Sequence, residues 1–387
     1  MTLKIYYWAP IISKIATIRA VINSAKSLKL NSKKFDCTLI NSIGEFSSFS
    51  SELKKYKIKL NNFHKSDLKK FLPSNGYLFS RFSFFVIFIL SFFKLKDVLQ
   101  KEKPHYLIIH LITSLPLILN LIYNFDTKFI LRVSGLPKLN FFRKLLWKIA
   151  INKVQYVTCP TRETKNFLIK NKLVTKQKVM TLHDPVIDEN YIKKKSTMLK
   201  NKSSLLKKKY GNFIFCAGRL TQQKNFSLII KSFKSISLTD NNLKLIIAGE
   251  GELKQKLNEL IYKLNLQKRV FIIGHQKNIY PYFKACKIFC LPSLWEDPGF
   301  VLIEAAFFKS NIVSSNCPNG PKDFFKNLNY KYNFRSNNLE ELNQKLLKII
   351  LSKYKIPEQN KNILFSRAMK YTSLNHFKKL KNLLISN

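Results

Sequence analysis

Glycine, arginine and acidic residues are all scarce in this chain. Its 387 residues include ten Gly, nine Arg and 22 Asp and Glu, against 68 Lys and Arg together. Because arginine reads base edges better than lysine does, this composition argues against sequence-specific recognition of nucleic acid. The net charge of +46 leaves two interpretations open: a lysine-rich solvated surface, or attraction to anionic lipid or nucleic acid.

Cysteine and histidine motifs are also missing. The six cysteines show no Cys-x-x-Cys spacing and no compact framework, which indicates a reduced environment rather than a disulfide scaffold. The six histidines form no His-x-x-x-His or His-Glu-x-x-His pair, so we expect no catalytic zinc. The N-terminal residues lack the regions of a signal peptide, and we therefore predict a cytoplasmic location.

No apolar run is long enough to cross a bilayer. The most apolar one, residues 82–93, has 12 residues, whereas a spanning helix needs about 20. Arg81, Lys94 and Lys96 flank this run. It fits either a buried helix of an α/β domain or a helix lying in the membrane interface.

The length suits two domains rather than one core. In the first half, continuous apolar runs near the start and at 106–112, 128–133 and 154–159 alternate with helical stretches, which is typical of parallel strands covered on both faces. We predict a first, acceptor-side Rossmann-like domain at 1–190. The polar, lysine-rich residues 191–209 are interpreted as a linker.

The same rhythm restarts in the second half. Apolar runs at 212–218, 243–249, 269–274, 287–292 and 310–315 predict the strands of a second Rossmann-like domain at 210–356. Six of the ten glycines fall at the ends of its strands or helices, among them Gly218 and Gly274. Such glycines let a backbone approach a ligand beyond the carboxyl ends of parallel strands, so this domain is the predicted nucleotide binder. Residues 357–387 have a helical pattern and are expected to cross back to the first domain.

One acidic pair stands out in the segment 292–324. Glu296 and Glu304 are separated by seven residues, and Pro298-Gly299 interrupts the chain between them. We expect Glu296 in a loop and Glu304 in the first turns of the next helix, both facing one cleft. Carboxylates there can bind sugar hydroxyls, and the free N–H groups of Gly299, Phe300 and Val301 can bind a diphosphate.

Four segments in order, at 216–233, 246–253, around the acidic pair and at 314–324, resemble the C-terminal half of family 4 glycosyltransferases. These are retaining GT-B enzymes, which use nucleotide-diphospho-sugars and consist of two doubly wound α/β domains facing a central cleft. The resemblance implies that Arg219 and Lys224 cradle the donor diphosphate, Glu296 contacts the donor sugar and Glu304 receives the ribose hydroxyls. Gly320, Pro321 and Asp323 occupy the place of the family's Gly-Pro-x-Glu turn.

In the first half, His110 follows an apolar run at the family position of a histidine near the reacting carbon of the donor. Arg132 and the three residues after it are further candidates for the cleft. The resemblance implies transfer of a hexose or related sugar with retention, without a cofactor or metal. The expected donor is a UDP-sugar, and the expected acceptor is a glycan or lipid-linked glycan of surface polysaccharide, lipopolysaccharide or oligosaccharide synthesis.

Other functions stay open at this stage. A non-catalytic protein that binds nucleic acid or an anionic membrane would explain the charge but not the motifs, and would bind any duplex with a steep salt dependence. Another GT-B enzyme, such as a sugar-nucleotide epimerase or a phosphorylase, would need further acid and base groups or a pyridoxal lysine motif. For the transferase we expect a location at the cytoplasmic face of the inner membrane, attached peripherally.

Overall fold

The computed structural model describes residues 2–12, 16–73, 77–351 and 356–385. The chain divides into two compact units. The first unit combines Met1–Pro185 with Ser373–Asn387, and the second is Val186–Thr372. The C-terminal residues from Ser373 on belong to the first unit because helix α16 (Ser373–Ile385) packs against its helix α1 (Ala16–Asn31).

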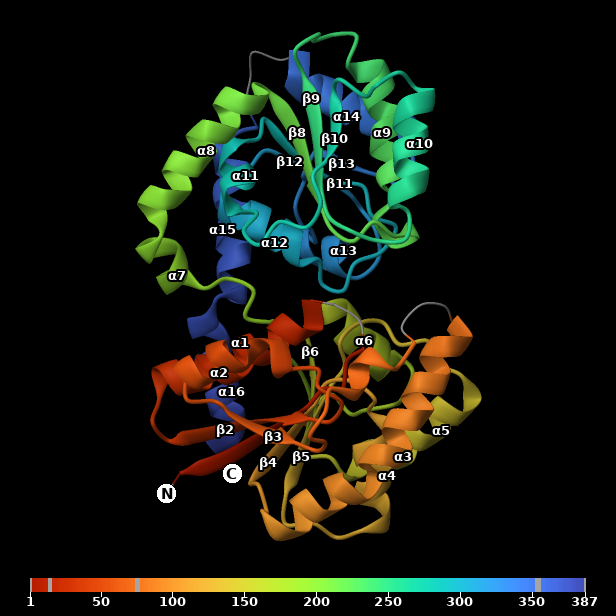
Figure 1. Cartoon of the computed structure of the whole chain (residues 1–387), viewed down its shortest axis with the longest axis vertical. Helices are drawn as coiled ribbons and strands as arrows, with labels where there is room; N and C mark the ends of the chain where they lie inside the picture. The colour runs from red at the N-terminus through yellow and green to blue at the C-terminus, as the bar shows by residue number, and fades with distance from the viewer. Residues whose placement is uncertain (1, 13–15, 74–76, 352–355, 386–387) are drawn as a thin grey trace. The chain divides into compact units, whose positions relative to one another are not determined.

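The first unit is built on a seven-stranded parallel sheet with the order β3-β2-β1-β4-β5-β6-β7 (Figure 1). Its strand order reverses between β1 and β4, as in doubly wound folds. The predicted strands at the start and at 106–112, 128–133 and 154–159 are confirmed as β1, β4, β5 and β6. The strands are β1 (Leu3–Trp8), β2 (Phe35–Asn41), β3 (Lys59–Asn62), β4 (Tyr106–Ile109), β5 (Lys128–Arg132), β6 (Tyr156–Cys159) and β7 (Val179–Thr181).

Helices cover both faces of this sheet because both faces are apolar. In β1, Ile5 and Tyr7 join one buried cluster, and Tyr6 and Trp8 join the other, as the two-residue period of a strand requires. Helices α1, α2 and α16 contribute to the first cluster, and α3 to α6 to the second. The remaining helices are α2 (Ser50–Lys55), α3 (Tyr77–Lys101), α4 (Ser114–Ile122), α5 (Phe141–Lys153) and α6 (Arg162–Lys170), with short turns η1 (Ser47–Phe49) and η2 (Leu68–Lys70).

The second unit contains a six-stranded parallel sheet with the order β10-β9-β8-β11-β12-β13. All five strands predicted in this half are confirmed. Alternate residues of β8 again enter opposite cores, Ile214 and Cys216 on one face and Phe213 and Phe215 on the other. The strands are β8 (Phe213–Ala217), β9 (Lys244–Ala248), β10 (Val270–Ile272), β11 (Ile288–Leu291), β12 (Ile312–Ser315) and β13 (Asn333–Phe334).

Helices flank this sheet on both faces as well (Figure 1). Together with the first unit, this gives the predicted α/β class with two doubly wound sheets. The helices are α7 (Glu189–Lys194), α8 (Ser196–Tyr210), α9 (Phe226–Ile236), α10 (Lys254–Lys263), α11 (Tyr280–Ala285), α12 (Phe300–Phe307), α13 (Gly320–Phe324), α14 (Leu339–Leu351) and α15 (Glu358–Ala368), with turns η3 (Gln222–Lys224) and η4 (Met369–Tyr371).

The lysine-rich segment 191–209 differs from the expected linker. It forms most of α7 and α8, and α8 packs against α11 of the second unit. The buried residues Leu199, Ser203 and Tyr210 lie at helical spacing, while the lysines between them are exposed. A serine in this buried stripe hides the amphipathic period from a hydropathy pattern, which explains the difference.

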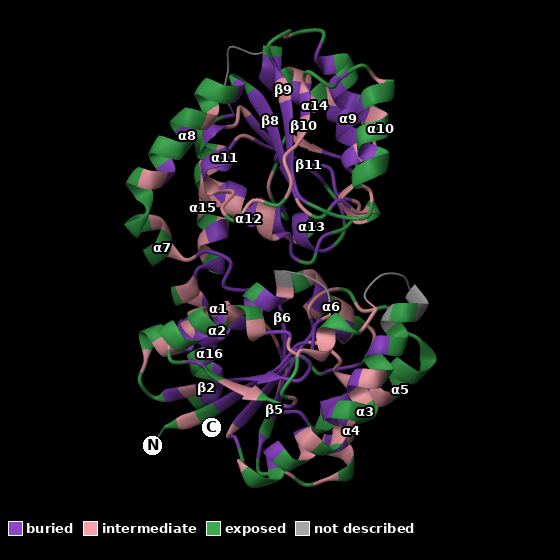
Figure 2. Ribbon diagram, in the orientation of Figure 1, coloured by how far each residue is buried: buried purple, intermediate pink, exposed green. Residues whose placement is uncertain are grey.

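The apolar run 82–93 lies in α3, a helix of 25 residues. One side of α3 is buried in the first unit, yet its other side exposes large apolar residues such as Phe82 and Phe85 (Figure 2). The interpretation as a buried helix of an α/β domain therefore describes the inner side of α3 but not its outer side. Among the helices that the structure describes, none combines the length and hydropathy that crossing a membrane would require.

Candidate functional site

The predicted site residues of the second unit gather at the carboxyl edge of its sheet. The strand order reverses between β8 and β11, and ligands of open α/β sheets bind beyond the strand ends at such a point. The loop after β8 carries Gly218, Arg219 and Lys224, and the loop after β11 carries Glu296. Leu294 N–H donates to the Gln223 carbonyl at 2.8 Å and so joins the two loops.

Lys224 and Glu296 form a buried ion pair. The Lys224 Nζ lies 2.6 Å from Glu296 Oε1, and their side chains are 13% and 4% exposed. The hydroxyl of Ser293 donates to the same carboxylate oxygen at 2.6 Å. The Lys224 ammonium has three N–H donors, and the Glu296 carboxylate accepts from one of them. The other N–H groups are available to a ligand.

Arg219 is exposed beside this pair. Within the part of the chain that the structure describes, its guanidinium has no hydrogen bond or ion pair. The Gly218 position lies against the Lys224 side chain, since an added Cβ would come within 3.1 Å of Lys224 Cε. A cation without a protein partner at a strand end is available to an anion such as a diphosphate.

Helix α12 begins directly after this loop. Its N-cap is Gly299, with φ at +91°, a conformation that other residues adopt only with strain. Phe300 and Val301 form the first turn, whose N–H groups have no partner within the helix. The sequence prediction that this turn opens the helix is confirmed.

The loop after β12 closes onto the Glu296 loop. Gly320 N–H donates to the Glu296 carbonyl at 2.8 Å, and the Asn319 side chain donates to Asp297. A Cβ on Gly320 would lie 1.9 Å from the Pro298 carbonyl oxygen, so the backbones meet too closely for any side chain. Asp323 lies in α13, where its N–H bonds to the Asn319 carbonyl at 2.9 Å.

Glu304 has a neighbourhood of its own on α12. Burial raises its pKa to about 8, and hydrogen bonding with Tyr280 of α11 acts in the opposite direction. Glu304 is half-buried in the structure. Tyr280 is thus the side chain of the protein that faces Glu304.

Gly274 follows β10, next to the loop after β9. Its carbonyl accepts from Gly249 N–H at 2.9 Å, and an added Cβ would lie 2.8 Å from Glu250 Oε1. Gly249 in turn lies against the Gly218 carbonyl oxygen. Three neighbouring strands therefore end in glycines that touch or nearly touch one another at this edge.

His110 lies in the first unit, directly after β4, and is 3% exposed. Both of its ring nitrogens are buried without a hydrogen-bond partner among the described residues. Burial, together with Arg132 and His376, holds its pKa well below the usual value. A neutral imidazole offers one donor and one acceptor, so His110 has unused capacity at this strand end.

Arg132 lies beside His110 in a second buried ion pair. Its Nε donates to Asp184 Oδ1 at 3.0 Å, and the side chains of the pair are 7% and 2% exposed. Its Nη1 also donates to the Ser134 hydroxyl at 2.8 Å. Arg132 is thus held within the first unit rather than free for a ligand.

Sequence reasoning missed four residues that orient these groups: Ser293, Tyr280, Asn319 and Asp184. Only Asp184 left a signal, because an acidic residue is rare in this chain and it directly follows His183 near the end of an apolar strand. The other three became recognisable only from their contacts.

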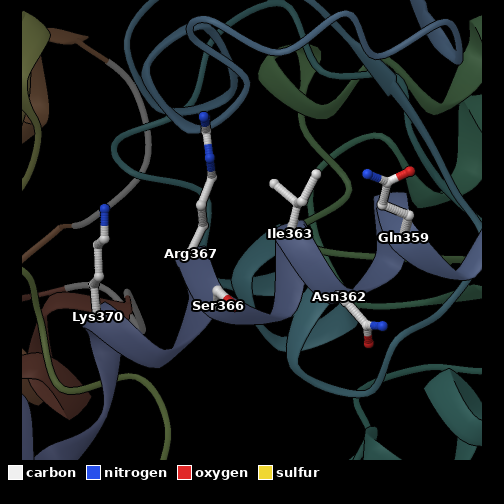
Figure 3. Close-up of a pocket in the computed structure, with 6 residues that line it drawn as sticks. All are labelled: Gln359, Asn362, Ile363, Ser366, Arg367 and Lys370. Atoms are coloured by element: carbon white, nitrogen blue, oxygen red, sulfur yellow. The ribbon is translucent and has the colours of Figure 1, made fainter.

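A hollow of about 620 Å³ lies along α15, away from these residues in the chain. Its lining consists of Gln359, Asn362, Ile363, Ser366, Arg367 and Lys370 (Figure 3). None of the predicted site residues lines it. Among the described residues, no group of three or more His, Cys, Asp or Glu is arranged to hold a metal ion.

The fold and the site together define a class. Solved structures with the same fold cover the whole chain at low identity. A glycosyltransferase from Rickettsia africae has a TM-score of 0.77 at 17% identity, covering 100% of this chain and 99% of that one. Anabaena Alr3699/HepE in complex with UDP and glucose has a TM-score of 0.70 at 14% identity, covering 100% of both chains. The chain therefore has the GT-B fold.

The sequence of the second unit is similar to one family and to several curated proteins. Residues 198–364 match the family described as Glycosyl transferases group 1. The chain is 34% identical over 251 residues to an uncharacterized glycosyltransferase of Methanocaldococcus jannaschii, covering 60% of each. It is 29% identical over 192 residues to a Campylobacter jejuni N-acetylgalactosaminyltransferase acting on a diphospho-undecaprenol-linked sugar, covering 48% of this chain and 49% of that protein.

The chain thus spans between about half and 60% of the length of these two curated relatives. Its second unit matches the family described as Glycosyl transferases group 1 over residues 198–364, and the chain has the GT-B fold. The resemblance predicted from the four segments is confirmed at this level.

Proposed function

We propose that this protein is a glycosyltransferase that moves a hexose or related sugar from a nucleotide-diphospho-sugar to an acceptor hydroxyl with retention. The observation that carries the proposal is the buried Lys224–Glu296 pair beside the exposed Arg219, at the strand reversal of a group 1 domain. Few other ligands combine a dianionic phosphate portion with hydroxyls that need a carboxylate acceptor.

Each group has a role in the proposed reaction. Arg219 and Lys224 hold the negative charge that the diphosphate gains as its bond to the anomeric carbon breaks, and the start of α12 adds its dipole. Glu296 accepts hydrogen bonds from the donor sugar, and Glu304 from the ribose. The acceptor oxygen bonds to the anomeric carbon on the same face, while its proton passes to the departing diphosphate. No cofactor takes part in these steps.

His110 acts on the donor or acceptor hydroxyls from the first unit. Its two ring nitrogens are unpartnered among the described residues, so the imidazole can donate to one hydroxyl and accept from another. Its pKa, which burial holds well below the usual value, keeps the imidazole neutral. Arg132 holds its place through Asp184.

Similar proteins suggest which nucleotide base the donor carries, which acceptor receives the sugar and where the enzyme works. The HepE structure contains UDP and glucose, and the Campylobacter relative is named for a diphospho-undecaprenol substrate. On this basis we propose a UDP-sugar donor and a glycan or lipid-linked glycan acceptor in surface polysaccharide or lipopolysaccharide synthesis. Such an acceptor places the enzyme at the cytoplasmic face of the inner membrane, as a peripheral protein.

A donor screen tests the activity. Purified protein is offered UDP-, GDP- and ADP-sugars, and nucleotide release is measured with and without acceptor extracts. We expect release from one base class and losses of at least about a hundredfold for Arg219→Ala and Glu296→Ala. Lys268→Ala, at the opposite edge of the sheet, and Glu358→Ala, an exposed carboxylate on α15, are matched controls. Equal rates in all four variants would show that the site is misassigned.

A further inference from the structure

The exposed apolar side chains of this protein are concentrated on a small part of the chain. Within the described residues, 24 large hydrophobic side chains are exposed, and 14 of them lie between residues 71 and 149. Single exposed apolar residues are ordinary, but a contiguous group indicates a surface that something else covers. Most of this group lies on α3 and α5.

Helix α3 is apolar on its outer side as well as on its inner side. Its outward stripe is Phe82, Phe85, Ile89 and Phe93, spaced by three and four residues and exposed by 60%, 64%, 55% and 69%. Its inward side combines the apolar residues Ile87 and Leu95 with two serines, Ser83 and Ser91, and all four are fully buried. The Ser91 hydroxyl has no partner among the described residues. A helix that packed only on its own domain would have a polar outer side.

Helix α5 repeats this pattern with added charge. Phe142, Leu145 and Ile149 are 78%, 49% and 54% exposed. Arg143, Lys144 and Lys148 are exposed among them, and α5 has no acidic residue.

The two helices belong to one layer. Both pack against α4 and contribute to the same buried cluster of the first unit (Figure 1). The acidic residue of α3, Asp97, lies in its last turns, beyond the apolar stripe. We call the outer side of α3 and α5 the α3/α5 surface; it is apolar and cationic.

We propose that the α3/α5 surface docks on an anionic lipid bilayer, with both helices lying in the interface. Phenylalanine side chains enter the acyl boundary while Lys and Arg reach the lipid phosphates, and basic residues add about 1 kcal/mol each near such a surface. A second copy of the chain fits less well, because Arg143, Lys144 and Lys148 would face their own like charges. This docking surface specifies the peripheral location proposed above. It rests on the proposed function in one respect, because a lipid-linked acceptor is what would require the protein to be at a membrane.

Vesicle flotation without any sugar donor tests the docking. Wild-type protein is expected to float with phosphatidylcholine vesicles that contain phosphatidylglycerol, and not with phosphatidylcholine alone. The variant Phe82→Gln/Phe85→Gln/Phe142→Gln should bind at least about tenfold more weakly. Its control, Leu205→Gln/Leu238→Gln/Tyr262→Gln, removes three side chains of the second unit with exposures of 65%, 77% and 72% and should bind like wild type.

A charge-matched pair separates the surface from the overall charge. Arg143→Glu/Lys144→Glu/Lys148→Glu and Lys193→Glu/Lys194→Glu/Lys200→Glu change the net charge equally, but only the first lies on the α3/α5 surface. We expect loss of vesicle binding for the first alone, at low salt. Equal losses from both would overturn the proposal, since binding would then reflect net charge.

Two further readouts complete the test. If the triple Gln variant converts a dimer to a monomer in light scattering yet floats like wild type, the surface is a contact between copies and the proposal is wrong. Donor hydrolysis measured without vesicles should be unchanged in that variant. Because flotation needs no donor, failure of docking and failure of the proposed transferase activity are distinguishable.

Discussion

The two units share one strand order and use its carboxyl edge differently. In the second unit the loops after β8 and β11 hold the Lys224–Glu296 pair next to an exposed arginine. In the first unit the corresponding region holds the Arg132–Asp184 pair next to the enclosed His110. The shared topology fixes where a site can form, and the loops decide whether its charge faces a ligand or is neutralised within the protein.

The units also differ in their helices. In α9 of the second unit the large apolar residues, among them Phe226, Ile229 and Phe233, are buried. In α3 of the first unit the exposed side is as apolar as the buried one. A hydrophobic pattern alone therefore predicts the packing of α9 correctly but not which side of α3 faces the core.

The largest effect is expected from breaking the two buried ion pairs. Glu296→Gln and Asp184→Asn each leave a buried cation uncompensated, and each should lower the free energy of unfolding by about 3 to 5 kcal/mol. Chemical denaturation of each variant gives this value for the unit that carries the change. Nucleotide release, by contrast, should fall at least about a hundredfold in Glu296→Gln.

A double variant separates stability from function. Lys224→Met/Glu296→Leu removes both charges and should regain most of the lost stability, while nucleotide release stays abolished. If Glu296→Gln kept both wild-type stability and activity, the pair would have neither proposed role.

Glycine positions provide the next contrast. Gly320→Ala should lower the free energy of unfolding by about 3 kcal/mol, because its Cβ would meet the Pro298 carbonyl oxygen at 1.9 Å. Gly211→Ala meets nothing within 4 Å and has only the strain of its φ of +65°, which costs about 1 to 2 kcal/mol. The difference is measured from the urea denaturation midpoints of the two variants, provided that the dependence of the unfolding free energy on urea concentration is the same in both. A smaller loss for Gly320→Ala than for Gly211→Ala would mean that the loop after β12 adjusts freely.

Much of this architecture could be predicted because it depends on local sequence. The run 243–249 gave β9, and Pro298-Gly299 placed Glu296 in a loop and Glu304 on a helix. The contact of Tyr280 with Glu304 could not be predicted, since it joins α11 and α12 through tertiary packing. The helical state of 191–209 was missed for a related reason: Ser203 is buried only because α8 packs on α11.

The pH dependence of the second unit tests the environment of Glu304. Burial raises its pKa from 4.5 to about 8, so folding favours the protonated form. Its contribution to stability is full below pH 4.5 and is lost as the pH rises towards 8. Glu304→Gln should remove this slope and stabilise the protein at the alkaline end of the range. Glu358→Gln, whose side chain is 62% exposed, should leave the slope intact, and an unchanged slope in Glu304→Gln would contradict the assignment.

The smallest effect contrasts two buried serines, one from each unit. Ser293 donates to Glu296 at 2.6 Å, so Ser293→Ala should lower the free energy of unfolding by about 1 to 2 kcal/mol. Ser91 is buried in α3 with no partner for its hydroxyl among the described residues, so Ser91→Ala should be neutral or stabilising by up to about 1 kcal/mol. Urea denaturation gives both values. A destabilising Ser91→Ala would reveal a hydrogen bond between this hydroxyl and the core on the inner side of α3.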